Sequence, residues 1–148
     1  MIMSRVLVVL ATVLTVSATA QGARLGLKDL PATVRQAVEA QTKDSTIRTI
    51  SVEKKNGVTF YEVETTTRNG VQRDLLFSAD GALTETEERL AAKEWPRPIV
   101  AAMRKEGEIK RIERLTKGSD VTYEVTVAKD GRQREIEVRA DGTVVNGK

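Results

Sequence analysis

The chain has 148 residues and contains neither cysteine nor histidine. Its 24 lysines and arginines nearly balance its 21 aspartates and glutamates, which leaves a formal net charge of +3. The composition therefore excludes Ser-His-Asp and Cys-His catalysis, disulfide bonds, and the usual histidine and cysteine metal sites. Chemistry based on carboxylates, lysine or hydroxyls remains, as does a binding function.

Residues 1–20 have the pattern of a secretory signal peptide. A basic start at residues 1–5 precedes an apolar run at 6–16, and residues 18–20 (Ala-Thr-Ala) supply the small side chains that signal peptidase requires. The alternative is an uncleaved membrane anchor, but the apolar run is shorter than the roughly 20 residues that span a bilayer. The pattern predicts cleavage after Ala20, a periplasmic or secreted protein, and no stable membrane span after cleavage.

The rest of the chain contains one internal repeat. Four short motifs recur in the same order at a nearly constant interval: Phe60-Tyr61-Glu62-Val63 as Thr122-Tyr123-Glu124-Val125, Arg68-Asn69-Gly70 as Lys129-Asp130-Gly131, Ala79-Asp80-Gly81 as Ala140-Asp141-Gly142, and Leu30-Pro31 as Trp95-Pro96. A fixed interval of this size indicates one supersecondary unit used twice.

Each unit is predicted to begin with a helix. Pro31 opens the first helix, and Pro96 with Pro98 opens the second, because proline suits the first turn. Gly107 is a plausible end for the second helix. Apolar side chains follow at helical spacing, in the first unit at Val34, Ala37 and Val38, and in the second at Ile99, Val100 and Met103.

Turn motifs then divide each unit into four strands. Asn-Gly and Asp-Gly pairs favour tight hairpins, because such turns need positive φ at adjacent positions. The turns are expected at Asn56-Gly57, Asn69-Gly70 and Asp80-Gly81, and at Gly118-Ser119, Asp130-Gly131 and Asp141-Gly142. We therefore expect an α+β fold of two tandem repeats, each one helix packed on a four-stranded antiparallel meander sheet. The repeats cover residues 28–86 and 94–147, with a linker at 87–93.

The turns also determine the strand register. A two-residue loop at Asp130-Gly131 pairs Val125 with Ile136 and Tyr123 with Val138. A three-residue loop, Arg68-Asn69-Gly70, keeps the same alternation in the first unit. The faces expected to lie against the helices then carry Ile50, Val52, Tyr61, Val63, Leu75 and Phe77 in the first unit, and Ile112, Tyr123, Val125, Ile136, Val138 and Val145 in the second.

Two interpretations remain open for the acidic segment between the units. Thr84 and Glu87 have the spacing of a capping box and would open a further helix. Alternatively, Thr84 ends the fourth strand and the acidic residues after it form a solvated linker.

The order of these motifs resembles that of PepSY-like domains. A helix opened by Leu-Pro, a strand with Tyr-Glu-Val and a hairpin closed by Ala-Asp-Gly occur in both copies, over residues 28–86 and 94–147. The tandem arrangement is similar to the two-repeat architecture of β-lactamase-inhibitory-protein-like proteins. The resemblance implies an exported bacterial protein that binds or inhibits another protein. No target is transferred, because this chain lacks cysteine and has few aromatic residues.

An apolar cluster is expected on the sheet face that points away from the first helix. The register places Phe60 opposite Ser78 and Ser78 opposite Leu83, with Leu76 diagonal to them. A contiguous apolar cluster on an exposed face indicates a partner-binding surface, with Phe60 as its anchor. The alternative is that Leu25, Leu27 or Leu90 covers the cluster, or that the two units pack through it.

A basic stretch is the second candidate site. Its members are Arg104, Lys105, Lys110, Arg111, Arg114 and Lys117. They would suit an anionic surface, but interleaved glutamates and the lack of aromatic residues also fit an ordinary solvated face. The exported location argues against nucleic acid as the partner. The carboxylate pairs Glu62 with Glu64 and Glu135 with Glu137 are ordinary for an exposed strand, so neither a metal nor a cofactor is expected.

The sequence therefore predicts an exported, non-enzymatic binding module that acts through a sheet face. A protein or peptide is the expected partner, and inhibition of a peptidase or other hydrolase is one form of this function. The alternative is a structural or sensory module of the cell envelope that binds anionic polymers by charge.

Overall fold

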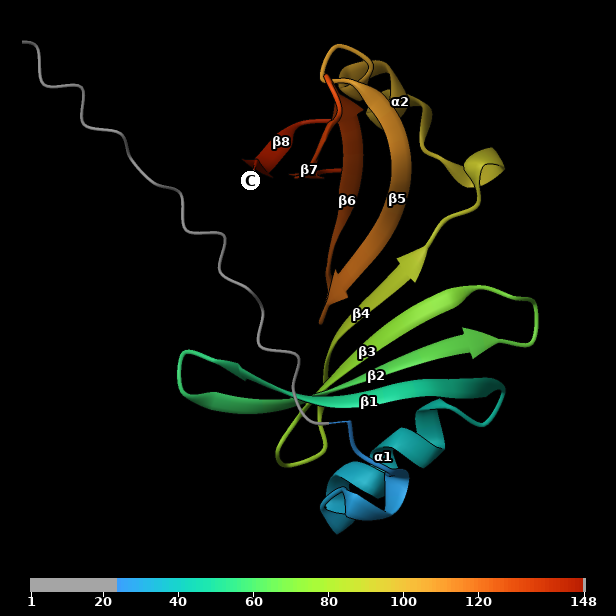
Figure 1. Ribbon diagram of the computed structural model, residues 1–148, viewed down its shortest axis with the longest axis vertical. Coiled ribbons are helices and arrows are strands. Elements are labelled where there is room, and N and C mark those ends of the chain that lie inside the picture. Colours follow the sequence, from blue (N-terminus) through green and yellow to red (C-terminus); the bar gives the residue numbers. More distant parts are fainter. Residues whose placement is uncertain (1–23, 148) are drawn as a thin grey trace, which may run out of the picture.

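The computed structural model describes residues 24–147, so the expected signal peptide at residues 1–20 lies outside the described part (Figure 1). Two short 3₁₀ helices, Leu27–Asp29 and Ala92–Glu94, precede the two α-helices. The other elements, in chain order, are α1 (Ala32–Gln41), β1 (Ser45–Lys55), β2 (Val58–Thr67), β3 (Gln72–Ser78), β4 (Leu83–Arg89), α2 (Arg97–Met103), β5 (Glu108–Lys117), β6 (Asp120–Lys129), β7 (Arg132–Val138) and β8 (Val144–Gly147).

All eight strands belong to one antiparallel sheet in the order β1 to β8 (Figure 1). The expected fold class, two repeats that each have their own four-stranded sheet, is therefore wrong. The sheet is continuous because β4 runs on to Arg89 and pairs with β5 from Thr86↔Thr116 to Arg89↔Glu113. Both interpretations of the segment after Thr84, a capped helix and a linker, fail for the same reason.

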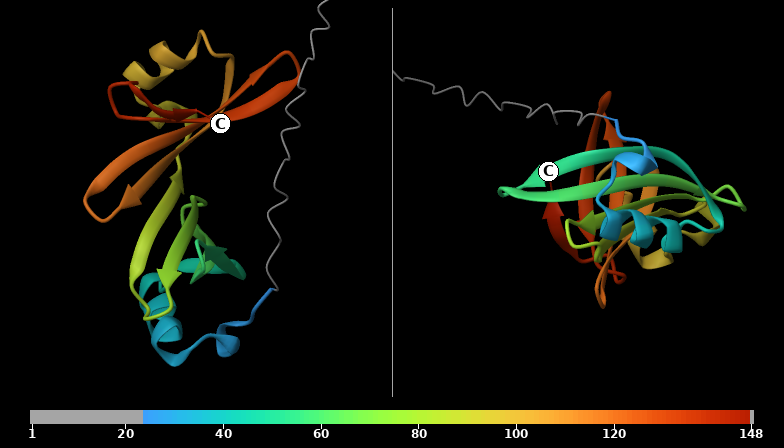
Figure 2. Two further views of the ribbon diagram at one scale, coloured as in Figure 1. Left: turned by 90° about the vertical axis from the view of Figure 1, so that its left-hand side faces the viewer. Right: turned by 90° about the horizontal axis from the view of Figure 1, so that it is seen from below.

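Both helices lie on the same side of this sheet (Figure 2, left). We call this side the inner face and the opposite side the outer face. Each helix covers its own hydrophobic core, in which the apolar stripe expected from the sequence meets the strands of its own half. The first core contains Leu30, Val34, Val38, Ile50, Val63, Leu75 and Phe77, and the second contains Ile99, Met103, Ile112, Val125, Val127, Ile136 and Val138.

The register of the central hairpins is confirmed. Val125 pairs with Ile136, and Tyr123 pairs with Val138. The three-residue loop in the first unit is closed by the Thr67 amide, which donates to the Val71 carbonyl at 2.9 Å. Glycine and asparagine occupy the turn positions because positive φ is required there, as at Asn56 (52°) and Gly57 (80°).

β-Bulges overturn the expected register at the last strand of each half. Thr84 is an extra residue in β4, so Leu83 pairs with Phe77 and not with Ser78. The Thr84 hydroxyl stabilises this bulge by donating to the Leu76 carbonyl at 3.0 Å. A matching bulge in β8 pairs Val138 with Val144. Val145, which was expected on the buried face, is consequently 37% exposed.

The repeated Ala-Asp-Gly motif has a structural reason in both halves. Gly81 and Gly142 adopt φ of 88° and 87° in the turns that end at β4 and β8. A Cβ atom on Gly81 would lie 2.9 Å from the Thr33 carbonyl oxygen, and one on Gly142 would lie 2.9 Å from the Pro98 carbonyl oxygen. Each turn therefore packs directly on the first turn of its helix, which only glycine permits.

None of the helices within residues 24–147 has both the length and the apolar character that a membrane crossing requires.

The helix–turn contact predicts an unequal response to alanine at two glycines with nearly the same φ. Gly81→Ala should lower the free energy of unfolding by about 3 kcal/mol, since both a strained φ and a backbone clash result. Gly70→Ala should cost only about 1 kcal/mol, because φ is 81° but no atom lies within 4 Å of the added Cβ. Urea unfolding followed by circular dichroism measures both values. Equal losses would show that the approach to the helix is unimportant.

Candidate functional site

The outer face of the sheet is strongly acidic. The register aligns its carboxylates across neighbouring strands, as in the pairs Glu64↔Asp74, Asp74↔Glu87 and Glu113↔Glu124. Fewer cations share this face, and they include Lys55, Arg89 and Arg111. The acidic side chains on this face include Glu53, Glu62, Glu64, Asp74, Glu85, Glu87, Glu113, Glu124, Glu135 and Glu137.

Three adjoining pockets hollow this outer face. The acidic pocket, about 30 Å³, is lined by Leu75, Leu76, Lys55 and five carboxylates: Glu53, Glu62, Asp74, Glu85 and Glu87. The middle pocket, about 270 Å³, shares two of these carboxylates and adds residues of β5. The basic pocket, about 600 Å³, is lined by Arg89, Lys110, Arg111, Thr126, Gln133, Arg134 and Glu135. The surface thus changes from acidic to basic as it crosses from the first half to the second.

Burial and mutual repulsion raise the pKa values of the acidic pocket. Burial, with Glu124 as the next cause, raises the pKa of Glu87 to about 8. Burial, followed by the charge of Glu64, raises the pKa of Asp74 to about 6. Desolvation disfavours the charged form of a carboxyl group, and nearby carboxylates add to this effect. The acidic pocket therefore carries a proton near neutral pH.

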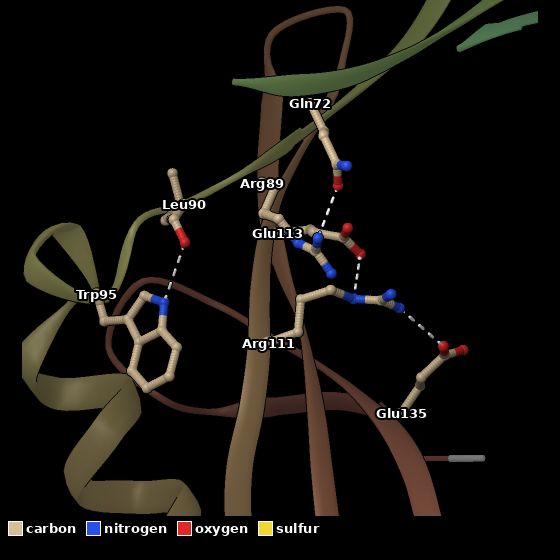
Figure 3. Close-up of polar contacts among 7 residues, drawn as sticks. All are labelled: Gln72, Arg89, Leu90, Trp95, Arg111, Glu113 and Glu135. Atoms are coloured by element: carbon tan, nitrogen blue, oxygen red, sulfur yellow. Dashed lines mark hydrogen bonds and ion pairs between the residues drawn. The ribbon is translucent and has the colours of Figure 1, made fainter. Parts of the chain in front are cut away.

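The basic pocket is organised around Arg111 (Figure 3). Its Nε lies 3.0 Å from a carboxylate oxygen of Glu113, and its Nη2 lies 3.4 Å from a carboxylate oxygen of Glu135. Arg89, on the neighbouring strand, donates to the side-chain oxygen of Gln72 at 2.7 Å. The ion pairs of Arg111 and the hydrogen bond of Arg89 hold the two guanidinium groups beside each other on the outer face.

The expected partner-binding residues are only partly brought together. Phe60 is half-buried on the outer face, where it pairs with Ser78 as expected. Leu76 lies on the same face but is only 8% exposed, whereas Leu83 is 38% exposed beside the β4 bulge. The leucines considered as a cover pack elsewhere: Leu25 and Leu27 contact the first core, and Leu90 contacts the second.

The basic residues identified in the sequence do not form one patch. Arg111 belongs to the outer face, whereas Arg114 pairs at 2.7 Å with Glu88 on the inner face. Lys117 lies 3.3 Å from Glu85, and Lys110 lies 2.6 Å from Glu108. Arg104 and Lys105 follow the end of α2. No sequence pattern indicates Arg89, Thr126 and Arg134 as site residues, because only strand pairing brings them to the same pocket.

The clustered carboxylates do not make a metal site. In the described part of the chain, no group of three or more acidic side chains has an arrangement suited to a metal ion.

Solved structures share this fold. A Bacteroides eggerthii protein described as periplasmic matches with a TM-score of 0.66 and 15% identity, over 80% of this chain and 88% of its own. A BLIP-like protein from Bacteroides fragilis matches with a TM-score of 0.61 and 18% identity, over 80% and 85%. A DUF2874 family protein from Bacteroides ovatus matches with a TM-score of 0.64 and 11% identity, over 80% and 86%. The chain therefore has the fold of a BLIP-like protein.

No family model matches the sequence, and no curated protein matches it either. The resemblance to PepSY-like domains consequently stays a prediction.

The raised pKa of Glu87 predicts how stability depends on pH. Because the folded state binds this proton more tightly than the unfolded state, the free energy of unfolding should fall as pH rises from about 4.5 to about 8. Glu87→Gln removes this pH-dependent loss. Between pH 5 and pH 8, the free energy of unfolding of the variant should therefore rise by about 1 kcal/mol relative to that of the natural protein, after allowance for solvent screening. Thermal unfolding at a series of pH values tests this. Glu39→Gln, at an exposed position of α1, is the control and should leave the profile unchanged.

Proposed function

We propose that this protein is an exported, non-enzymatic binding module that holds a protein partner on the outer face of its sheet. One observation carries the proposal: both helices lie on the inner face, so the outer face is left open across the sheet and is hollowed by three adjoining pockets. A large uncovered sheet face with concave regions is a suitable surface for another protein.

The likeness to known structures supports this function. Neighbours with the same fold include a BLIP-like protein and a protein described as periplasmic. The secretory pattern at residues 1–20 points independently to export. Inhibition of a hydrolase is the finer form of the proposal, in which the outer face covers the active site of its partner.

Phe60 and Leu76 are the proposed apolar anchors of the outer face. Phe60 is half-buried and presents apolar surface to a partner, while the better buried Leu76 supports it. Leu83, which was expected beside them, pairs with the core residue Phe77 and therefore belongs to the inner-face register. Leu76 also lines the acidic pocket. An aromatic anchor beside charged groups is the usual composition of a protein–protein hot spot and its polar surroundings.

The acidic character of the outer face argues against an anionic polymer as the main partner. The many carboxylates distributed over this face repel a polyanion, and the basic residues expected to attract it point to different sides of the sheet. A protein partner satisfies both the apolar and the charged parts of the surface.

Phe60→Glu should preserve folding and weaken partner binding by at least about tenfold, since Phe60 lies outside both hydrophobic cores and an aromatic anchor dominates an interface. Immobilised residues 21–148 would be used to retain proteins from an envelope or culture-medium extract of the source organism, with the unfolding transition checked by circular dichroism. Val121→Glu, at an exposed position of β6 that pairs with the inner-face Thr116, is the matched control. Failure of the folded natural protein to retain a stoichiometric partner would contradict the proposal.

A further inference from the structure

Thr126 is an unusual residue at the base of the basic pocket. It lies on β6 between Arg111 of β5 and Glu135 of β7, with which it forms successive cross-strand pairs. It is only 7% exposed, and its hydroxyl has no hydrogen-bond partner among the groups of residues 24–147. By contrast, Thr122 on the same strand donates to Glu137 at 2.7 Å. A buried hydroxyl without a partner is destabilising, so its presence here needs a reason.

The ion pair between Arg111 and Glu135, beside Thr126, is arranged so that an external carboxylate can replace that of Glu135. Arg111 and Glu135 flank Thr126, and their charged groups meet at 3.4 Å, which is longer than the usual contact of a charge-assisted hydrogen bond. The Glu135 side chain is 46% exposed, so it can turn into solvent at little cost. Arg111 stays in position after such a change because the carboxylate of Glu113 remains ion-paired with it, 3.0 Å from its Nε, although the geometry of this contact is not that of a hydrogen bond. Glu135 thus occupies the place that an external carboxylate would take.

Further groups around the pocket favour an anion. Arg89 donates to the neutral side chain of Gln72, and it lines both the basic pocket and the middle pocket, so it places a positive charge at the border between them. Lys110 also lines the pocket and is paired with Glu108. Arg134 lines it too, but it pairs across the strands with the core residue Val127 and its guanidinium is bound to Glu106, so it adds no free charge to the pocket. The volume of about 600 Å³ is large enough for an organic acid or a phosphate ester.

The first half of the chain offers an internal comparison. The core rows Ile50↔Val63↔Leu75 and Ile112↔Val125↔Ile136 are equivalent, so the adjacent rows of cross-strand partners on the outer face are also equivalent. These are Thr49, Glu64 and Asp74 in the first half, and Arg111, Thr126 and Glu135 in the second. The fold therefore does not require an arginine and a threonine at these positions.

We propose that the basic pocket binds an oxyanionic group, a carboxylate or a phosphate, which displaces Glu135, pairs with Arg111 and accepts a hydrogen bond from the Thr126 hydroxyl. The group belongs either to a free small molecule or to a side chain of a bound protein. The basic pocket belongs to the outer face proposed above as the partner surface, so this inference rests on that function when the group is carried by a protein. It is distinct from the apolar anchors around Phe60, and binding of a small anion to it can be tested without a partner.

Citrate, inorganic phosphate and a short acidic peptide serve as probes, each titrated at constant ionic strength because salt screens such contacts. Amide chemical shifts in NMR spectra of the ¹⁵N-labelled protein report binding at Arg111 and Thr126. Arg111→Gln should weaken binding at least about tenfold, and Glu135→Gln should strengthen it several-fold, because the competing carboxylate is lost. Arg132→Gln, at an exposed position of β7 outside the pocket, controls for net charge.

Thr126→Val separates a ligand role from a structural role. Valine has the same shape without the unpaired hydroxyl, so the variant should melt at the same or a higher temperature and still bind the probe several-fold more weakly. Citrate or phosphate binding indicates a free small anion, and binding of the acidic peptide alone indicates a carboxylate carried by a protein. Absence of binding by all three probes, or equal losses in Arg111→Gln and Arg132→Gln, would overturn the proposal.

Discussion

The pairing of β4 with β5 is the contact on which the architecture depends. Each helix covers only its own half, and the two hydrophobic cores are separate clusters. The halves are therefore joined by the backbone ladder from Thr86↔Thr116 to Arg89↔Glu113, with ion pairs such as Arg114–Glu88 beside it. Antiparallel strand pairing has strict geometry, so this short ladder orients one half relative to the other.

The same junction creates the chemistry of the outer face. The middle pocket lies over it and takes Asp74 and Glu87 from the first half and Arg111 and Glu113 from the second. Without the junction, an acidic surface and a basic pocket would belong to two separate sheets. With it, they form one surface on which a partner meets both charges, and such complementarity contributes mainly to the specificity and the rate of association.

The sequence predicts the local structure well, because turn chemistry and alternation are local. Glycines at positive φ and paired apolar positions such as Val125 and Ile136 determined the hairpins correctly. A fourth strand was expected in the first half, but its continuation past Thr84 to Arg89 was not, because these residues are mostly glutamates and carry no apolar alternation to indicate a strand. The pairing of β4 with β5, and with it the continuous sheet, was therefore not predicted. The bulges at Thr84 and Val145 were not predicted either, because a single extra residue in a strand changes the register without changing the composition. The same limit applies to the site, since Arg89, Arg111 and Thr126 lie on three strands and meet only after pairing.

The order β1 to β8 also has a kinetic consequence. Every strand pairs with its neighbour in the sequence, and every connection except that from β4 to β5, which contains α2, is a short turn. Sheets built from such near-sequence contacts have low contact order for their class, and low contact order favours rapid folding. Export exposes an unfolded chain to aggregation before it reaches its final compartment, and this chain has no cysteine with which to lock a fold covalently. The connectivity of the sheet favours rapid folding, which limits the time that the exported chain spends unfolded without disulfide bonds to stabilise it.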